Sequence, residues 1–131
     1  MQRPPGDGRP LRVTVTRIDH VQVAAPPGCE EAARGFYGGL LGLEEIRKPE
    51  TLAGRGGCWF RAGPVELHVG VEEAFRPARK AHAGFVVDDL GALRRRLLAG
   101  GTVVQEDGPL PGVVRFYADD PFGNRLEFRQ Q

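Results

Sequence analysis

The sequence predicts an α+β fold made of two βαβββ modules, because the same order of elements occurs twice within 131 residues. Each half reads as one strand, one helix and three short extended runs, with Gly and Pro at the boundaries. The modules span about residues 17–72 and 81–131, and the charged segment EEAFRPARK joins them. This length fits a single domain and is too short for two independent hydrophobic cores.

The first half begins with RIDHVQVAA (17–25), whose β-branched, alternating pattern predicts a strand that PPG then ends. A helix is expected from about Glu30 to Leu41, because apolar residues recur at i, i+3, i+4 and i+7. The residues of this apolar face are Ala33, Phe36, Tyr37 and Leu40. The extended runs that follow are LEEIRKP, GCWFRAG and PVELHVGV.

The second half repeats this order. AHAGFVV (81–87) predicts a strand, and DDLGALRRRLLAGG predicts a helix with an Asp at its start and Gly100 at its end. Three extended runs follow, which are TVVQED, VVRFYAD and NRLEFRQ. The turn DDPFGN joins the last two.

Composition narrows the possible functions. The 18 Lys and Arg against 17 Asp and Glu favour neither nucleic acid nor an anionic membrane as a partner. No apolar run approaches the roughly 20 residues of a membrane span. Residues 1–16 lack the apolar region of a secretory signal and are expected to form a flexible tail, so the protein is expected in the cytoplasm with Cys29 and Cys58 reduced. Serine is absent, which excludes a serine nucleophile.

A carboxylate and an imidazole share one face of the strand expected over PVELHVGV. Side chains alternate between the two faces of a strand, so Glu66 and His68 point one way and Leu67 the other. Taken singly, a strand His is most often a structural residue and a strand Glu is usually solvated. Whether this face lines a site depends on which residues the rest of the chain places beside it.

The repeat places similar residues at matched positions. His20 and His82 fall in the first strands of their halves, Glu66 follows His20 by 46 residues, and Glu127 follows His82 by 45. Imidazole and carboxylate together suit Zn²⁺, Ni²⁺, Co²⁺, Mn²⁺ or Fe²⁺, so these four residues are candidate metal ligands. His68 breaks the spacing and ranks behind Glu66, as an alternative ligand or a residue that orients one.

The chain resembles the vicinal oxygen chelate superfamily in three features. These are the two-module plan, the motif FYGGLLGLEE in the first half and the motif DPFGNRLEF in the second. The superfamily includes glyoxalase I, extradiol dioxygenases and bleomycin-resistance proteins, and the resemblance covers about residues 17–129. It implies a curved mixed β-sheet with the helices on the outer face, and a site often shared between the chains of a homodimer.

The resemblance also implies roles for the candidate residues. The set His20, Glu66, His82 and Glu127 is similar to the metal ligands of glyoxalase I, in which Glu66 and Glu127 would be the catalytic carboxylates. The fosfomycin-resistance enzymes and the dioxygenases keep two histidines and one glutamate, and bleomycin-resistance proteins have the fold without the metal.

The expected function is a metal-dependent, glyoxalase-like isomerase or lyase acting on a small substrate with adjacent oxygens. A divalent metal ion would polarise a carbonyl while a glutamate moves the proton. Two alternatives remain open. One is an Fe(II) extradiol-type dioxygenase that uses His20, His82 and Glu127. The other is a metal-free protein that binds a drug or metabolite in the same cleft.

Overall fold

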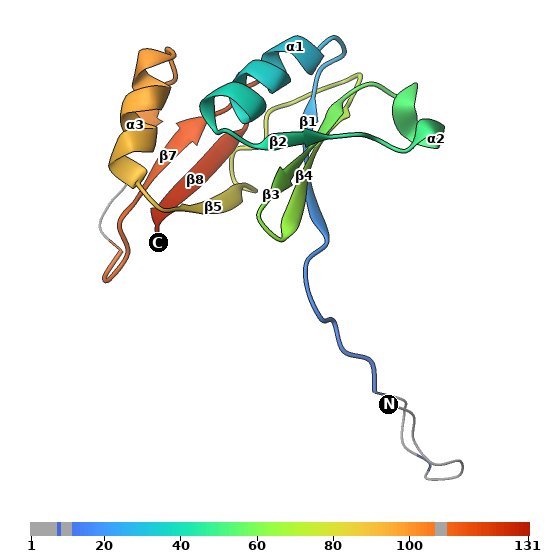
Figure 1. Cartoon of the computed structure of the whole chain (residues 1–131), viewed down its shortest axis with the longest axis horizontal. Coiled ribbons are helices and arrows are strands. Elements are labelled where there is room, and N and C mark those ends of the chain that lie inside the picture. Colours follow the sequence, from blue (N-terminus) through green and yellow to red (C-terminus); the bar gives the residue numbers. More distant parts are fainter. Residues whose placement is uncertain (1–7, 9–11, 107–109) are drawn as a thin grey trace.

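The computed structural model describes residues 8, 12–106 and 110–131. Most of the predicted flexible tail, and the last residue of the run TVVQED, lie outside these residues. Residues 12–19 form no regular secondary structure, and they run away from the body of the molecule at the bottom of Figure 1.

The first module has the predicted order of elements. Its strands and helices are β1 (His20–Ala25), α1 (Glu30–Ala33), η1 (Arg34–Leu40), β2 (Glu44–Ile46), α2 (Glu50–Ala53), β3 (Cys58–Ala62) and β4 (Val65–Val71). The sheet order is β1-β4-β3-β2, in which β1 runs parallel to β4 and the other pairs are antiparallel.

Two features of this module differ from the prediction. The helix widens into a π-helix at η1, where Leu41 donates its backbone N–H to the carbonyl of Phe36, five residues earlier. Gly38 and Gly39 lie in this segment, and glycine lowers the preference for a regular α-helix. The run LEEIRKP is a strand only as far as Ile46, and the short helix α2 that follows was not predicted.

The second module repeats the arrangement. Its elements are β5 (Ala83–Val87), α3 (Leu90–Ala99), β6 (Val104–Gln105), β7 (Arg115–Asp119) and β8 (Arg125–Gln130), in the sheet order β5-β8-β7-β6. The predicted cap of α3 is confirmed, because the Asp89 side chain accepts a hydrogen bond from the backbone of Ala92. The α+β fold of two βαβββ modules is therefore confirmed, and each module builds its own four-stranded mixed sheet.

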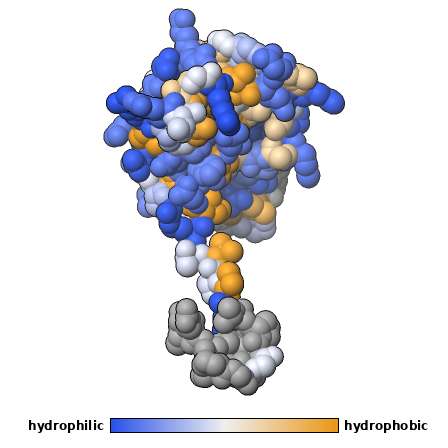
Figure 2. Space-filling model, turned by 90° about the vertical axis from the view of Figure 1, so that its right-hand side faces the viewer, coloured by the Kyte–Doolittle hydropathy of each residue, from blue (hydrophilic) through white to orange (hydrophobic). Residues whose placement is uncertain are grey.

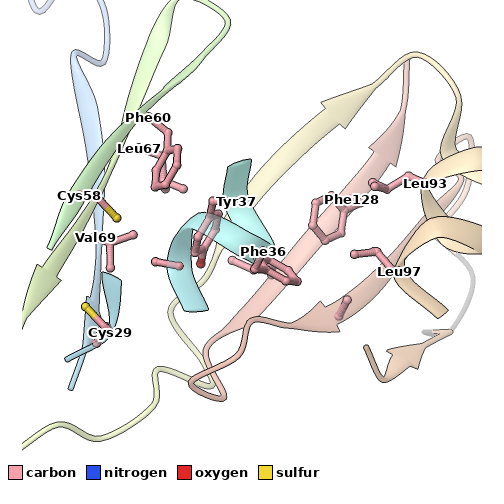
Figure 3. Close-up of a cluster of buried hydrophobic side chains, with 14 of the residues drawn as sticks. Cys29, Phe36, Tyr37, Cys58, Phe60, Leu67, Val69, Leu93, Leu97 and Phe128 are labelled. Atoms are coloured by element: carbon pink, nitrogen blue, oxygen red, sulfur yellow. The ribbon is translucent and has the colours of Figure 1, made fainter. Parts of the chain in front are cut away.

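Helix η1 lies between the two sheets and joins their cores. In Figure 3, Tyr37 lies toward Phe60 of β3, and Phe36 lies toward α3 and β8 of the second module. The Tyr37 ring is 5.8 Å from the Phe60 ring and fully buried. One short helix thus fills the space between the modules, so they share one hydrophobic core.

The turn DDPFGN fastens the second module to the first. Asp120 accepts a 2.7 Å hydrogen bond from the Tyr37 hydroxyl, and Asn124 donates a 2.8 Å hydrogen bond to the carbonyl of Ala24 at the end of β1. Asp120 and Asn124 are both buried, so these bonds replace those that water would make. Burial and the neighbouring Asp120 carboxylate hold the pKa of Tyr37 well above its usual value.

Helices α1 and α3 lie at the top of Figure 1, and α2 lies at the right-hand edge beyond β2. None of the helices in the described part of the chain is long and apolar enough to cross a membrane.

Candidate functional site

Each sheet presents apolar side chains to the helices and polar side chains on its other face. On β4, Leu67 and Val69 are buried in the core, while Glu66 and His68 project from the opposite face, as alternation predicts. On β8, Leu126 and Phe128 face the core and Glu127 faces the other way. The predicted site residues therefore belong to the polar faces of the two sheets.

His20, Glu66 and His68 come together on the polar face of the first sheet. His20 is the direct register partner of Glu66 across the parallel β1–β4 pair. His68 Nε2 lies 2.9 Å from Glu66 Oε1. The His68 ring stacks between two others, 3.6 Å from the Trp59 ring and 4.4 Å from the His20 ring, measured between centroids. His68 is therefore at the centre of this group, whereas the sequence placed it behind Glu66.

His82 and Glu127 form a second pair on the polar face of the other sheet. His82 Nε2 lies 3.0 Å from Glu127 Oε1, and its ring meets the Tyr117 ring edge-on at 5.5 Å. Arg115 and Arg129 both donate to the other carboxylate oxygen, Oε2. Burial opposes ionisation of Glu127, but the hydrogen bonds from Arg129, His82 and Arg115 outweigh it and hold its pKa at about 2. The carboxylate is therefore ionised over the whole physiological range.

His20 is the first residue of β1, whereas His82 directly precedes β5, which begins two residues later than predicted; in both rings Nδ1 lies beside an oxygen. His82 Nδ1 is 3.0 Å from the carbonyl oxygen of Lys80, which can only accept a hydrogen bond. His20 Nδ1 is 2.9 Å from Asp19 Oδ2, and this hydrogen bond lowers the pKa of Asp19. With Nδ1 donating, a neutral ring has its lone pair on Nε2, which is the usual orientation of a metal-binding histidine. In His82, however, Nε2 hydrogen-bonds Glu127 Oε1, so a metal bound there would replace this contact.

Equal spacing in the sequence does not correspond to equal position in the two sheets. His20 pairs with Glu66 46 residues later, but β5 pairs with β8 at a separation of 43, as in Gly84 with Glu127. Extending the β5–β8 register by one residue puts His82 opposite Arg125. Glu127 therefore lies two residues beyond the partner of His82, as His68 lies two residues beyond the partner of His20. The sequence separations of 46 and 45 residues, which ranked Glu66 above His68, therefore do not identify the residue of the first sheet that is equivalent to Glu127.

The neighbouring strands support the same equivalence. His68 is the register partner of Trp59 on β3, and Glu127 is the register partner of Tyr117 on β7. Each sheet thus sets one polar residue directly beside an aromatic ring. Trp59 and Tyr117 were not predicted as site residues, although alternation along GCWFRAG and VVRFYAD places both on the polar face.

A cleft of about 650 Å³ separates the two modules, and its walls are mostly apolar. Val21 and Leu67 come from the first module, and Phe85 and Phe128 from the second. Glu66 and His82 both line it, so one residue from each polar group opens onto the same space. Small-molecule sites typically combine such apolar walls with a few polar groups.

The candidate metal ligands come together in pairs, and not as one complete metal-binding group. Within the described ranges of this single chain, no three or more His, Cys, Asp or Glu residues gather in a metal-binding arrangement. Glu66–His68 at 2.9 Å and His82–Glu127 at 3.0 Å are hydrogen-bond contacts, and each brings one imidazole nitrogen and one carboxylate oxygen together.

The cysteines lie away from these groups and are poor nucleophiles. Cys29 and Cys58 are both buried free thiols in the core. Burial raises the pKa of the Cys58 thiol to about 11 and also raises that of Cys29. Neither thiol is ionised at neutral pH, so neither is an activated nucleophile.

Two βαβββ modules that each present histidine and carboxylate on one sheet face define the glyoxalase fold. Residues 17–128 match the family model of the Glyoxalase/Bleomycin resistance protein/Dioxygenase superfamily, and the chain belongs to that superfamily.

Solved structures agree with this assignment. A structure described as a glyoxalase family protein from Bacillus anthracis is 52% identical with a TM-score of 0.87, covering 92% of this chain and 98% of that one. Lactoylglutathione lyase from Agrobacterium tumefaciens is 21% identical with a TM-score of 0.69, covering 88% and 94%. A fosfomycin resistance protein from Listeria monocytogenes is 12% identical with a TM-score of 0.73, covering 90% and 95%. The last two likenesses concern the fold alone.

A curated relative matches only in part. The chain is 30% identical to glucose-6-phosphate isomerase from Synechococcus elongatus over 81 residues. These residues make up 62% of this chain. The chain spans 15% of the length of that relative.

Proposed function

We propose that the protein is a metal-dependent isomerase or lyase of the glyoxalase type, acting on a small substrate with two adjacent oxygens. The observation that carries this proposal is the pairing of an imidazole with a carboxylate in each module, with His20 opposite Glu66 in register and His82 Nε2 3.0 Å from Glu127 Oε1. Membership of the superfamily supports it, as does the fold shared with a lactoylglutathione lyase.

In this proposal His20, Glu66, His82 and Glu127 hold the metal. A divalent ion bound there would act as a Lewis acid toward a substrate carbonyl. Arg115 and Arg129 fix the Glu127 carboxylate by bonding Oε2, which leaves Oε1 beside His82 for the ion. Such hydrogen bonds to a ligand commonly set its orientation and charge.

The two predicted catalytic carboxylates are suited to different work. A general base works best with a pKa near the operating pH, and the pKa of about 2 makes Glu127 a weak base. Glu66 is bonded by no arginine in the described residues, and its side chain is 30% exposed beside the cleft. We therefore assign proton transfer to Glu66, which takes a proton from one substrate carbon and returns it to its neighbour, and a holding role to Glu127.

A second copy of the chain completes the proposed site. One chain supplies each half of the ligand set on a separate sheet, so an isologous dimer would bring unlike halves together. Large apolar side chains are exposed where such a partner would pack, including Val13 (90% exposed), Val15 (87%) and Val86 on the edge strand β5 (66%). Figure 2 shows apolar surface on the segment that extends from the body. Exposed apolar surface and free strand edges favour pairing.

Metal binding by the purified, EDTA-treated protein tests the proposal. Calorimetry with Zn²⁺ and Ni²⁺ should give saturable binding that weakens as the pH falls below the range in which imidazoles are neutral. His82→Ala and Glu127→Ala should each abolish it, whereas Glu73→Gln, an exposed control, should not. If the double variant His82→Ala/Glu127→Ala binds metal as tightly as the parent, the ligands are misassigned.

One observation favours a second function, a metal-free protein that binds a drug or metabolite. The cleft of about 650 Å³ with apolar walls could hold such a guest without an ion. Elemental analysis of protein purified without chelator separates the two functions, since only the enzyme should retain a stoichiometric metal.

A further inference from the structure

Three arginines lie on the same face of the second sheet as Glu127. Arg115 is on β7, and Arg125 and Arg129 are on β8, where alternation directs them away from the core. Two of them bond the carboxylate: Arg129 Nε is 2.5 Å and Arg115 Nη1 is 3.4 Å from Glu127 Oε2. This face therefore carries three guanidinium groups and two carboxylates, those of Glu127 and Asp119, in a chain whose net charge is only +1.

Arg125 differs from the other two because no carboxylate engages it in the described part of the chain. Its register partner on β7 is Asp119, which is held instead by Arg79 at 2.8 Å. The buried Arg125 Nε has no hydrogen-bond partner among the described residues. A buried donor without a partner costs free energy, so a ligand or water that accepts a hydrogen bond from Nε would relieve this cost. A merely solvated arginine would keep its Nε in water.

The Arg125 guanidinium lies over the Tyr117 ring, which also contacts His82. Its central carbon lies 3.8 Å from the centroid of the Tyr117 ring, a close cation–π contact. The same Tyr117 ring touches His82 at 5.5 Å, so one aromatic ring supports both residues. Arg125 and Glu127 are two residues apart on one face of β8, which corresponds to roughly 6–7 Å along the strand. That distance is within the span of one small molecule.

We infer that Arg125 binds an oxyanion of the substrate, a carboxylate or a phosphate-type group, while the rest of the substrate reaches His82 and Glu127. The inference rests on the proposed function, because it places the anion beside the metal position. A guanidinium presents parallel N–H donors that match two oxygens of such a group, and a planar stacked arginine is already oriented for it. The substrate class is therefore a small anionic compound with adjacent oxygens.

The experiment uses NMR of the metal-free full-length protein and follows the backbone amide resonances of β7 and β8 in the parent and all variants, together with the Arg125 Nε–Hε resonance in the parent. Inorganic phosphate and sodium acetate are titrated separately against a constant chloride background, and the tighter ligand identifies the kind of oxyanion. Saturable shifts of the Arg125 resonance are expected with at least one of them. Arg125→Met should weaken that binding tenfold or more, Arg125→Lys should weaken it less, and the exposed control Arg95→Met should leave it unchanged.

Two results would overturn the inference. One is equal oxyanion affinity in the parent, Arg125→Met and Arg125→Lys proteins, and the other is equal loss in Arg95→Met. Calorimetry with Zn²⁺ on the same samples separates this question from the proposed function. Metal binding without oxyanion binding rejects the role of Arg125 alone. Oxyanion binding without metal binding keeps Arg125 as an anion site and rejects the metal enzyme.

Discussion

His68 and Glu127 occupy equivalent places in the two sheets, each the register partner of an aromatic residue on the neighbouring strand. In the first module the polar residue is an imidazole stacked on Trp59, and in the second it is a carboxylate beside Tyr117. The stacking holds His68 in place between two rings, so it can act on its neighbour Glu66 through their 2.9 Å contact but has little freedom to move a proton itself.

The first prediction concerns this pair. Glu66→Gln should retain the metal but lose turnover of a hemithioacetal substrate by about 10²–10⁴, the usual contribution of a general base. His68→Gln should lose less, because it only removes the group that orients Glu66. The measurements are kcat for turnover and calorimetry for metal. A larger loss of kcat in His68→Gln than in Glu66→Gln would reverse the two roles.

The second prediction is that Glu127 makes folding stability depend on acid pH. Its pKa is about 2 in the folded protein against a usual value of 4.5, so the unfolded chain binds the proton more readily. The resulting stability is present above pH 4.5 and is lost as the pH falls toward 2, and it amounts to roughly 3 kcal/mol.

Urea unfolding of the EDTA-treated protein at several pH values between 5 and 2.5 checks this, with Glu127→Gln beside the parent. The free energy of unfolding of the parent should fall more steeply with acid than that of Glu127→Gln. The exposed control Glu73→Gln should follow the parent. Parallel curves for parent and Glu127→Gln would show that the arginine contacts do not lower the pKa.

The sequence predicted the two modules and the shared face of Glu66 and His68, because alternation and helical periodicity are local properties. It did not predict register, which depends on how whole strands pair: offsets of 46 and 45 residues looked equivalent, yet the sheets pair at 46 and 43. For the same reason the contact of Arg125 with Tyr117 was missed, since it joins two strands. The π-helix also escaped prediction, because its wider turn follows from the packing of Phe36 and Tyr37 between two sheets.

The third prediction concerns the contact between the modules. Tyr37→Phe removes the 2.7 Å hydrogen bond to Asp120 and leaves a buried carboxylate oxygen with one partner fewer. The free energy of unfolding should fall by about 1.5–3 kcal/mol, the usual range for a hydrogen bond to a charged group. Urea denaturation measures the change. Tyr117→Phe is the control, because no hydrogen bond of its hydroxyl is found in the described residues, and an equal loss in both variants would contradict the prediction.

The last prediction tests whether the metal site is shared between two chains. The protein should have the mass of a dimer of the 14.3 kDa chain by light scattering at micromolar concentration. His20→Ala and Glu127→Ala proteins should each fail to bind metal alone, since every site in such a dimer lacks one ligand. When the two are unfolded together and refolded as a mixture, half the dimers should be mixed. In a mixed dimer, one site takes its first-module ligands from the Glu127→Ala chain and its second-module ligands from the His20→Ala chain. About a quarter of the sites of the parent should then reappear. A site confined to one chain would stay empty in every mixture, so metal stoichiometry after refolding decides between the two arrangements.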